Sequence, residues 1–370
     1  MIAGEASGDL HGAKLIENLK RESKNIEIYA VGGEKIRQTG AKNFFDLAYF
    51  HATGITDAIK KIPRYKKAFD KILKDIQSVK PDLVVLIDNP GFNFRLAEKI
   101  HLLHIPLVYY IAPQLWAWNE KRIFKMKRWA RKVLVVFEFE KALYETHGIP
   151  VAFVGHPLKD LISETPRRRE SGRPPGSPLQ VSLLPGSRKG ELKMLLNVFL
   201  DAAKVIQERL PQVSFQIIQA PSMPWEIYEK AISKRGLSVR VVDKNSYEAI
   251  AQSDLAIVCS GTATLECALL TVPMIISYKA SLLTYAIAKK VIQVPCIGMP
   301  NLILGEKKFP ELLQKEATPQ KIAEEAVLIL TDLTRQKTMR RDLEEVSRRL
   351  GAPGASARAA EEILKILQHR

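Results

Sequence analysis

Short apolar runs alternate with amphipathic stretches of helical spacing along most of the chain. Strands that alternate with helices in this way form parallel sheets whose two faces are covered by helices. The pattern predicts an α/β protein with two doubly wound, Rossmann-like domains. The apolar runs lie at residues 26–31, 83–87, 107–111, 132–136 and 151–154 in the first half, and at 180–184, 214–219, 239–242, 255–258 and 274–277 in the second.

A proline-rich segment separates the two halves. Residues 163–180 read "SETPRRRESGRPPGSPLQ", with four prolines, a cluster of charges and no periodicity, which is typical of an interdomain linker. We therefore expect an N-terminal domain at residues 1–165, a linker at 166–179, a C-terminal domain at 180–350 and a final helix at 351–370. Because ligands bind at the carboxyl ends of such strands, we expect a cleft where the strand ends of the two domains face one another.

The balance of charge is unusual for a protein of ordinary hydrophobic content. The chain of 370 residues has 56 Lys and Arg against 40 Asp and Glu, a net charge of +16, while 46% of its residues are hydrophobic. Such a surface suits anionic partners: nucleic acid, acidic lipid or a phosphorylated small molecule. Three cysteines without a CxxC pair indicate a reducing cytoplasm. No apolar run approaches the roughly 20 residues that span a bilayer, so we expect a soluble protein that at most lies on a membrane surface.

The chain opens with a strand, a glycine-containing turn and a helix, "MIAGEASGDLHGAKLIENLK". Its glycines recur every fourth residue, which matches neither the GxGxxG spacing of dinucleotide-binding turns nor a Walker motif. Glu5 and Asp9 bracket the turn and would repel a phosphate, so Glu5 suits hydrogen bonding to sugar hydroxyls or acid–base catalysis, with Gly8 in the same cleft. The alternative, that Asp9 caps the helix and the glycines only permit the turn, remains open. Because only three residues precede Gly4, we expect the native chain to start upstream of Met1.

Two turns in the second half are candidate anion sites, and the first is "VSLLPGSRKGELKM". Here a strand leads through Pro185, Gly186 and Ser187 to Arg188, at the start of a long amphipathic helix. The guanidinium of Arg188 and the free amides of the helix N-terminus can bind a diphosphate together. The alternative is a turn arginine in a surface salt bridge.

The second turn, "CSGTATLE", follows another apolar strand. Ser260, Gly261 and Thr262 offer backbone amides, and Ser260 is placed to cap the next helix. Glu266 follows one turn into that helix. A diphosphate at the amides and a ribose diol at Glu266 would fit a nucleotide sugar.

The first half supplies a candidate general base. Asp88 ends the strand at 83–87 and is followed by an Asn-Pro-Gly turn and a helix. A strand-end carboxylate can face the binding crevice and take a proton from an acceptor hydroxyl, while a simple helix cap is the alternative. His156, in "FVGHPL", also follows a strand, and both a cleft role and a packed, hydrogen-bonded histidine are open. The seven histidines are scattered and predict no metal site.

Two basic segments carry apolar residues at helical spacing. Residues 54–80 have eight basic and three acidic side chains, and residues 119–132 have seven basic and one acidic. Basic helices with an apolar stripe suit the surface of an anionic bilayer, although a solvated basic face is the alternative. The candidates for membrane or acceptor contact are Ile55, Ile59, Ile62, Lys66, Lys67 and Phe69.

Six motifs in a fixed order carry a resemblance to a known family: "AGEASGD", "PQLWAW", "FVGHPL", "LLPGSR", "SGTATLE" and "MPNLILG". Over residues 3–313 the chain closely resembles lipid-A-disaccharide synthase. The resemblance implies an inverting hexosyltransferase of the GT-B fold, acting in lipid A biosynthesis of Gram-negative bacteria, whose C-terminal helix packs back on the N-terminal domain. The implied reaction transfers 2,3-diacylglucosamine from UDP-2,3-diacylglucosamine to the 6-hydroxyl of 2,3-diacylglucosamine 1-phosphate. The resemblance also implies no cofactor and no metal, a cytoplasmic location with peripheral binding to the anionic inner-membrane surface, and a homodimer.

The resemblance also carries roles over to individual residues. We expect Asp88, helped by Glu5, to deprotonate the acceptor hydroxyl in a single inverting displacement. Glu266 matches the ribose ligand of GT-B enzymes. Many relatives carry a second acid where this chain has Gly91, so the resemblance does not extend to a paired-carboxylate mechanism. The leaving UDP would be held by Arg188 and the amides around Ser260, Gly261 and Thr262, with Asn301 orienting the donor.

Two other classes of function remain. Another GT-B enzyme that acts on a UDP-sugar, a transferase or an epimerase, would share the second-half nucleotide site but would not need basic apolar helices in the first half. A non-catalytic nucleic-acid-binding protein would account for the net charge of +16. It would not account for a strand-end Asp, a ribose-type Glu and a diphosphate turn in one cleft, so we expect no nucleic-acid partner.

Overall fold

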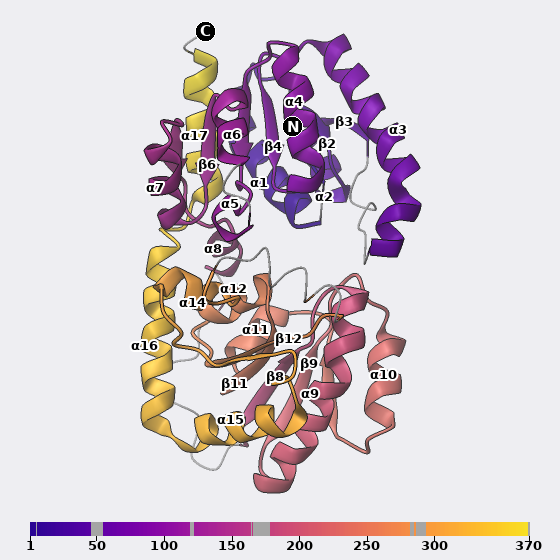
Figure 1. The fold of residues 1–370 in the computed structure, drawn as a ribbon, viewed down its shortest axis with the longest axis vertical. Coiled ribbons are helices and arrows are strands. Elements are labelled where there is room, and N and C mark those ends of the chain that lie inside the picture. The colour runs from indigo at the N-terminus through magenta and orange to yellow at the C-terminus, as the bar shows by residue number, and fades with distance from the viewer. Residues whose placement is uncertain are drawn as a thin grey trace. The chain divides into compact units, whose positions relative to one another are not determined.

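The computed structural model describes residues 1–4, 6–45, 55–118, 122–163, 165, 178–281, 285 and 294–368, with only the backbone described at 6, 43–45, 55–64, 117 and 118. The chain divides into two compact units. The first comprises Met1–Asp160 together with Leu350–Arg370, and the second comprises Leu161–Arg349. Each unit has a parallel sheet covered by helices (Figure 1), so the predicted α/β class is confirmed.

Within the described residues, the first unit is built on a seven-stranded parallel sheet of order β3-β2-β1-β4-β5-β6-β7. The order reverses at β1, which is the topological switch point where doubly wound sheets bind ligands. Ala3 of β1 pairs with Ile87 of β4, so the carboxyl ends of these two strands lie side by side. The strands are β1 (Ile2–Ala3), β2 (Tyr29–Val31), β3 (Lys42–Phe45), β4 (Val84–Ile87), β5 (Leu107–Tyr110), β6 (Lys132–Val135) and β7 (Val151–Phe153).

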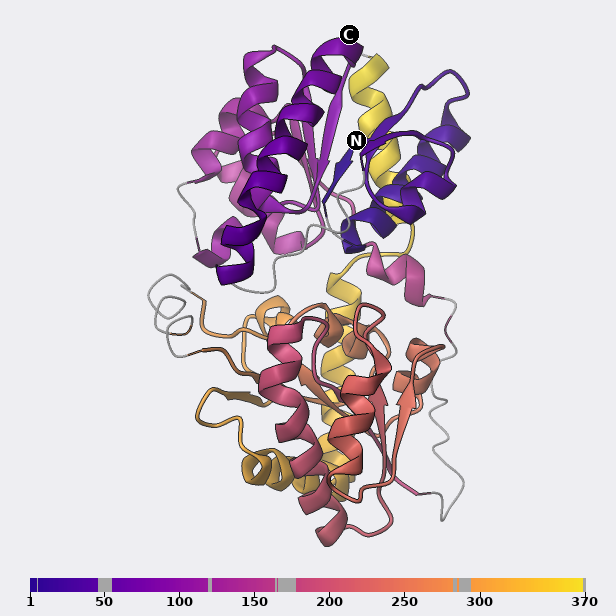
Figure 2. The same cartoon turned by 90° about the vertical axis from the view of Figure 1, so that its right-hand side faces the viewer.

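Helices cover both faces of this sheet (Figure 2). One face carries α3, α4 and α6, and the other carries α1 packed against α17. The helices are α1 (Ala6–Glu22), α2 (Glu34–Gln38), α3 (Ile55–Val79), α4 (Pro90–Leu102), α5 (Leu115–Trp118), α6 (Ile123–Trp129), α7 (Glu138–Thr146), α8 (Leu158–Ile162), which continues past the boundary of the unit, and α17 (Ala355–Gln368).

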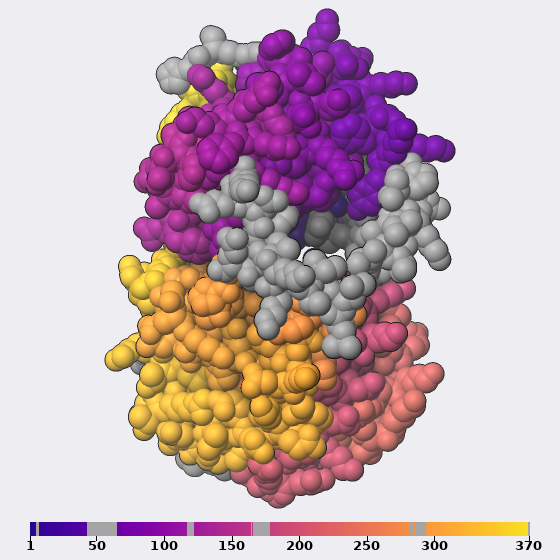
Figure 3. Space-filling view, viewed as in Figure 1, coloured from indigo at the N-terminus to yellow at the C-terminus, as the bar shows by residue number. Residues whose placement is uncertain are grey.

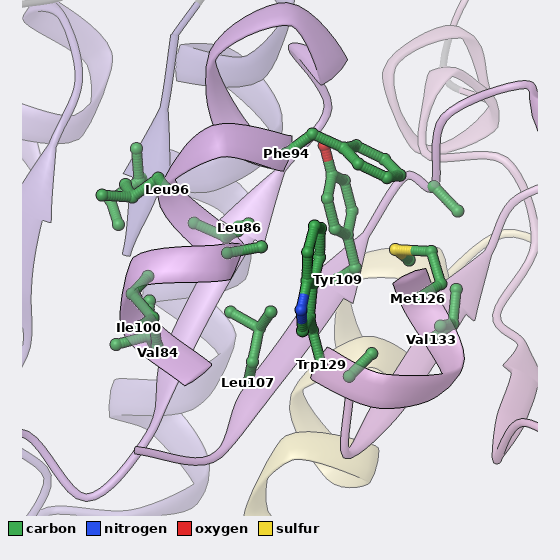
Figure 4. Close-up of a cluster of buried hydrophobic side chains, with 14 of the residues drawn as sticks. Val84, Leu86, Phe94, Leu96, Ile100, Leu107, Tyr109, Met126, Trp129 and Val133 are labelled. Carbon is green, nitrogen blue, oxygen red and sulfur yellow. The ribbon is translucent and has the colours of Figure 1, made fainter. Parts of the chain in front are cut away.

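A large apolar cluster fills the space between the sheet and the first of these helical layers (Figure 4). Tyr109 of β5 lies at its centre, fully buried. The ring centroid of Phe94, from α4, lies 6.2 Å from that of Tyr109 and 5.9 Å from that of Trp129, from α6. Burying side chains of this size contributes on the order of 2 kcal/mol each, and it fixes α4, the helix that follows Asp88.

A carboxylate ties the C-terminal helix to the first unit. Asp160 accepts hydrogen bonds from the N–H groups of residues 354–356, at 2.5 to 3.3 Å, and so caps the N-terminus of α17. Further along, Lys132 of β6 pairs with Glu362 of α17. The prediction that the C-terminal helix packs back on the N-terminal domain is confirmed.

The second unit has a six-stranded parallel sheet of order β10-β9-β8-β11-β12-β13 among its described residues. In Figure 3, α15 and α16, orange to yellow, form much of one face of this unit. Its strands are β8 (Gln180–Leu184), β9 (Ser214–Ile218), β10 (Val239–Val242), β11 (Leu255–Cys259), β12 (Met274–Tyr278) and β13 (Glu311–Leu313). Its helices are α9 (Lys189–Arg209), α10 (Trp225–Ser233), α11 (Ser246–Ala251), α12 (Thr262–Leu269), α14 (Met299–Leu304), α15 (Pro319–Thr331) and α16 (Leu333–Arg349).

The apolar pattern predicts the interior strands and the edge strands β7 and β10, and it misses the other two edge strands, β3 and β13. An edge strand pairs on one side only, and these two carry the short sequences KNFF and ELL, without an apolar run. Of the predicted linker at 166–179, all but the last two residues lie outside the described part of the chain. None of the described helices combines the length and the apolar character needed to cross a membrane.

Replacing Asp160 by alanine should loosen α17. The three N–H groups at its start would lose their acceptor, which costs about 1 kcal/mol or more. Hydrogen exchange followed by mass spectrometry should then show faster exchange in the peptides of α17. The control is Glu17→Ala on α1, which removes an exposed ion pair with Lys14 and should leave that exchange unchanged. Unchanged exchange in Asp160→Ala would contradict the assigned cap.

Candidate active site

The turn after β4 holds Asp88 in an unusual backbone conformation. Asp88 and Asn89 have φ angles of 48° and 46°, both in the left-handed region, and Pro90 begins α4 directly after them. Each such residue costs on the order of 1 kcal/mol or more, and strain of this kind concentrates at functional sites. The side chain of Asp88 is half-buried, and its backbone is held between the end of β4 and the start of α4.

Hydrogen bonds from neighbouring elements fix the main chain of Asp88. Its carbonyl oxygen accepts from the hydroxyl of Tyr109 at 2.7 Å and from Nδ2 of Asn93 at 2.8 Å. Its N–H donates to the carbonyl of Tyr110 at 3.1 Å. Burial, together with the nearby Asp88, raises the pKa of Tyr109 well above its usual value, so the phenol keeps the proton that it donates.

The opening glycine turn lies beside this strand end. A Cβ atom on Gly4 would stand 1.9 Å from Nδ2 of Asn89, so any larger residue there would displace the Asn89 side chain. A Cβ on Gly8 would lie 3.6 Å from Ala3, an ordinary contact, so the close packing of α1 on β1 does not depend on that glycine. Glu5, the predicted partner of Asp88, lies outside the described residues.

Asp9 neither faces the opening turn nor caps its own helix. It lies inside α1, and its buried carboxylate accepts from the N–H groups of Gly33, Lys35 and Ile36 at 2.7 to 3.1 Å. The alternative that Asp9 caps its own helix is therefore wrong: it holds the start of α2, 24 residues or more further along the chain.

His156 is a packed histidine. Its side chain is 8% exposed, its Nδ1 accepts from the N–H of Leu158 at 3.2 Å, and its ring lies 5.4 Å from that of Phe137. Burial, with a smaller effect of His11, lowers its pKa to about 3. It is therefore neutral at physiological pH, and the geometry favours the structural alternative over a cleft role.

Glu140 is a buried acid that the sequence analysis missed. It is 1% exposed on α7 and accepts from Nε1 of Trp116 at 3.0 Å and from the N–H of Phe137 at 3.3 Å. Burial raises its pKa to about 8. Trp116 belongs to the "PQLWAW" motif, so this acid holds the loop after β5. The sequence feature that could have identified Glu140 is its position shortly after the apolar run at 132–136.

In the second unit, a carboxylate from the first turn of α9 binds back to the turn between β8 and α9. Glu191 accepts from the N–H groups of Ser187 at 2.9 Å and Arg188 at 3.2 Å, and Nη1 of Arg188 lies 3.4 Å from its other oxygen. Gly186, at φ +116°, leaves room for the Glu191 side chain, because a Cβ atom on residue 186 would stand 2.5 Å from the Cβ atom of Glu191. Two N–H groups of this turn are thus already bound to a carboxylate, while the side chain of Arg188 is exposed.

The turn between β11 and α12 is more open. Gly261 has φ +152°, which glycine alone adopts without strain, and a Cβ built on it would meet no described atom within 4 Å. Gly261 and Thr262 are both exposed. Ser260 does not cap α12: its Oγ donates to the carbonyl of Ile297 at 2.8 Å, and Gly261 occupies the N-cap position.

Asn301 is fully buried, and its amide is saturated. Nδ2 donates to the carbonyl of Phe309 at 2.9 Å and to Oε1 of Glu311 at 2.8 Å, while Oδ1 accepts from the N–H groups of Lys308 and Phe309, both at 2.9 Å. An asparagine side chain makes about four hydrogen bonds in all. A direct contact of this amide with a donor sugar is therefore not supported, and Asn301 instead organises the segment between α14 and β13.

A family model described as "Lipid-A-disaccharide synthetase" matches residues 1–366. The chain belongs to this family. Proteins named lipid-A-disaccharide synthase from Syntrophus aciditrophicus and Geobacter sulfurreducens are 39% and 38% identical to it, over 100% and 99% of this chain and 97% and 96% of theirs.

Solved structures of lower identity share the fold of this family member. MurG of Acinetobacter baumannii matches with a TM-score of 0.61 at 15% identity, over 99% of this chain and 98% of that one. The UDP-GlcNAc 2-epimerase of Neisseria meningitidis, solved with UDP-GlcNAc bound, matches with a TM-score of 0.64 at 14% identity, over 98% of both chains. The predicted GT-B fold is confirmed.

The basic helix α3 of this synthase family member is only partly available to a surface. Lys66 and Lys67 are exposed, as predicted for a charged contact face. Phe69 is not a free apolar contact, because it packs on the core with its ring 5.7 Å from that of Phe92. The side chains of Ile55, Ile59 and Ile62 lie outside the described residues. Among the residues that the structure describes, no cluster of His, Cys, Asp and Glu could hold a metal ion.

Glu266 is the titratable group of the predicted nucleotide site in this family member. It is half-buried on α12, and burial raises its pKa to about 7. The ionised carboxylate accepts hydrogen bonds from the two hydroxyls of a ribose more strongly than the protonated form does. Binding of the ribose would therefore favour the ionised form.

The affinity for UDP should accordingly depend on pH. The dissociation constant, measured by isothermal titration calorimetry between about pH 5.5 and 8.5, should stay level above the pKa of Glu266 and increase as the pH falls below it. Glu266→Gln is the control, because UDP also titrates in this range; the variant should bind UDP more weakly and show only the dependence that belongs to UDP. If wild type and variant had parallel pH profiles, Glu266 would not contact the ribose.

Proposed function

We propose that the chain transfers 2,3-diacylglucosamine from UDP-2,3-diacylglucosamine to the 6-hydroxyl of 2,3-diacylglucosamine 1-phosphate. The products are the β-1,6-linked lipid A disaccharide 1-phosphate and UDP. Membership of the lipid-A-disaccharide synthetase family, over residues 1–366, is the observation that carries this function. It makes the chain a hexosyltransferase of lipid A biosynthesis.

In the proposed mechanism Asp88 is the general base. Its carboxylate takes the proton of the acceptor 6-hydroxyl as that oxygen bonds to the anomeric carbon of the donor. The bond from the anomeric carbon to the UDP oxygen breaks on the opposite side, so the configuration inverts and UDP leaves with the electron pair. The strained, multiply hydrogen-bonded turn at Asp88 supports this role, because a base must be held in place before the proton moves.

The second unit would hold the leaving group. We assign the growing charge on UDP to the exposed guanidinium of Arg188 and to the backbone amides around Gly261 and Thr262. Glu266 would accept the ribose hydroxyls. Because Glu191 already accepts from the N–H groups of Ser187 and Arg188, just before α9, we assign the larger share of the backbone contribution to the α12 turn.

Another UDP-sugar enzyme of the same fold is the second candidate. The epimerase and MurG structures share the fold at 14% and 15% identity, which supports the fold alone. Full-length relatives named lipid-A-disaccharide synthase at 33 to 39% identity favour the transferase. A nucleic-acid partner is not favoured.

The reaction is tested by UDP release from UDP-2,3-diacylglucosamine in detergent with EDTA, with and without the acceptor. Wild type should release UDP only when the acceptor is present. Asp88→Asn should lower turnover about a hundredfold or more, since the amide cannot take the proton, while UDP binding stays intact. The matched control is Asp82→Asn, because Asp82 lies just before the start of β4 and Asp88 lies just after its end. Near wild-type turnover in Asp88→Asn would remove the base assignment, and acceptor-independent release would contradict the transferase.

We further propose that the enzyme lies on the anionic cytoplasmic surface of the inner membrane, through α3. The exposed Lys66 and Lys67 and the net charge of +16 support this. The homodimer implied by the family resemblance stays a prediction, to be measured by sedimentation equilibrium.

Charge reversal on α3 should therefore weaken membrane binding. Wild type should co-sediment with vesicles containing anionic phospholipid at low salt and dissociate as salt is added, because salt screens the attraction. Lys66→Glu with Lys67→Glu should bind at least about tenfold more weakly. Lys14→Glu with Arg21→Glu, on α1, makes the same change of charge elsewhere on the unit and should bind like wild type. Equal loss in both double variants would mean that net charge, not α3, directs binding.

A further inference from the structure

A buried carboxylate lies behind the α12 turn, on the edge strand β13. Glu311 is 5% exposed, and its two oxygens accept three N–H donors. Oε1 accepts from the N–H of Gly298 at 2.9 Å and from Nδ2 of Asn301 at 2.8 Å, and Oε2 accepts from the N–H of Ile297 at 3.1 Å. Removing a carboxylate from water is costly, and these donors offset that cost.

One of these donors connects Glu311 to the α12 turn. The N–H of Ile297 donates to Glu311, and the carbonyl of the same residue accepts from Oγ of Ser260 at 2.8 Å. Ser260 is also held from the other side, because its N–H donates to the carbonyl of Ser277 at 2.9 Å. A short chain of hydrogen bonds thus runs from Glu311 through Ile297 to the residue before Gly261.

The packing around this chain leaves little room for adjustment. A Cβ atom on Gly298 would stand 2.9 Å from Oε1 of Glu311 and 2.4 Å from Cδ1 of Ile276, although the φ of Gly298 is an ordinary −78°. Glycine is present there for close approach and not for its backbone freedom. The saturated amide of Asn301 fixes the other side of the carboxylate.

We propose that Glu311 is a positioning residue for UDP binding, acting through Ile297 and Ser260 on the turn at residues 260–262. The inference rests on the proposed function, since it assumes that UDP binds at that turn. Glu311 contacts no ligand itself. Its effect is to keep the α12 amides in the orientation that a diphosphate needs, and Ser260 contributes through its bond to Ile297 and not through a hydroxyl given to phosphate.

Glutamine at position 311 removes one link of the chain selectively. A glutamine oxygen in the place of Oε1 keeps the acceptor for Gly298 and Asn301. Its NH₂ group then faces the N–H of Ile297, where two donors cannot bond. The side-chain volume hardly changes, so the loss falls on the contact that leads to Ser260.

The test is UDP affinity, measured by isothermal titration calorimetry on the full chain. Glu311→Gln should weaken UDP binding about tenfold, and Ser260→Ala should weaken it in the same direction. The double variant should lose less than the product of the two factors, because both act on the same link. In steady-state assays the KM for the UDP donor should rise in Glu311→Gln while the KM for the acceptor stays unchanged.

Asp9→Asn is the matched control. Asp9 is also 5% exposed and also accepts three N–H groups, but in the first unit. It should lower thermal stability without changing the affinity for UDP. Unchanged UDP affinity in Glu311→Gln, or an equal loss in Asp9→Asn, would overturn the inference. If Glu311→Gln failed to fold, Ser260→Ala would decide the matter, since wild-type affinity in that variant overturns the proposal equally. Wild-type protein that does not bind UDP would instead overturn the proposed function itself.

Discussion

Carboxylates that accept hydrogen bonds from main-chain N–H groups hold the loops at the strand ends of both units. Asp9 does this for the start of α2, and Asp160 does it for the start of α17. Glu191 and Glu311 do the same in the second unit, for the starts of α9 and α14. A parallel sheet needs many long connections, and each helix that follows a strand begins with N–H groups that have no partner in the helix. Such a carboxylate satisfies several of them at once, and Asp9, Asp160 and Glu311 also connect segments far apart in the sequence.

This constraint decides which helix N-termini are available to an anion. The N–H groups of Ser187 and Arg188, just before α9, donate to Glu191, so a phosphate would have to displace a carboxylate from these two. The start of α12 differs, because its N-cap is an exposed glycine in an extended, positive-φ conformation and Ser260 bonds away from the helix. The donor site proposed here accordingly rests more on the α12 turn and on the Arg188 side chain than on the first turn of α9. The acceptor side rests on a different feature, a strained turn at Asp88 whose Asn89 side chain packs against Gly4.

Much of this could be predicted from the sequence, and the failures have definite causes. Apolar runs predict the buried interior strands, since a strand covered on both faces must be apolar along its length. Strands β3 and β13 were missed because, unlike the edge strands β7 and β10, they carry no apolar run, and β13 carries Glu311, which was missed with it. The motifs predicted the turns that contain Arg188, Ser260 and Asp88, because glycine and strand-end polar residues are visible in sequence. They did not predict what each side chain bonds to: Asn301 was expected to face a ligand and is buried with all its hydrogen bonds filled.

The sequence by itself determined the fold class, the family and the order of the turns that carry chemistry, because these depend on periodicity and on local motifs. Only the tertiary structure decided which polar groups already have hydrogen-bond partners within the protein. Glu311 and Ile297, Asp9 and Gly33, and Asp160 and Gly354 are separated by 14, 24 and 194 positions in the chain. A hydrogen bond between such residues depends on which strands and helices lie side by side, and that arrangement is set by the packing of each unit and not by either sequence neighbourhood.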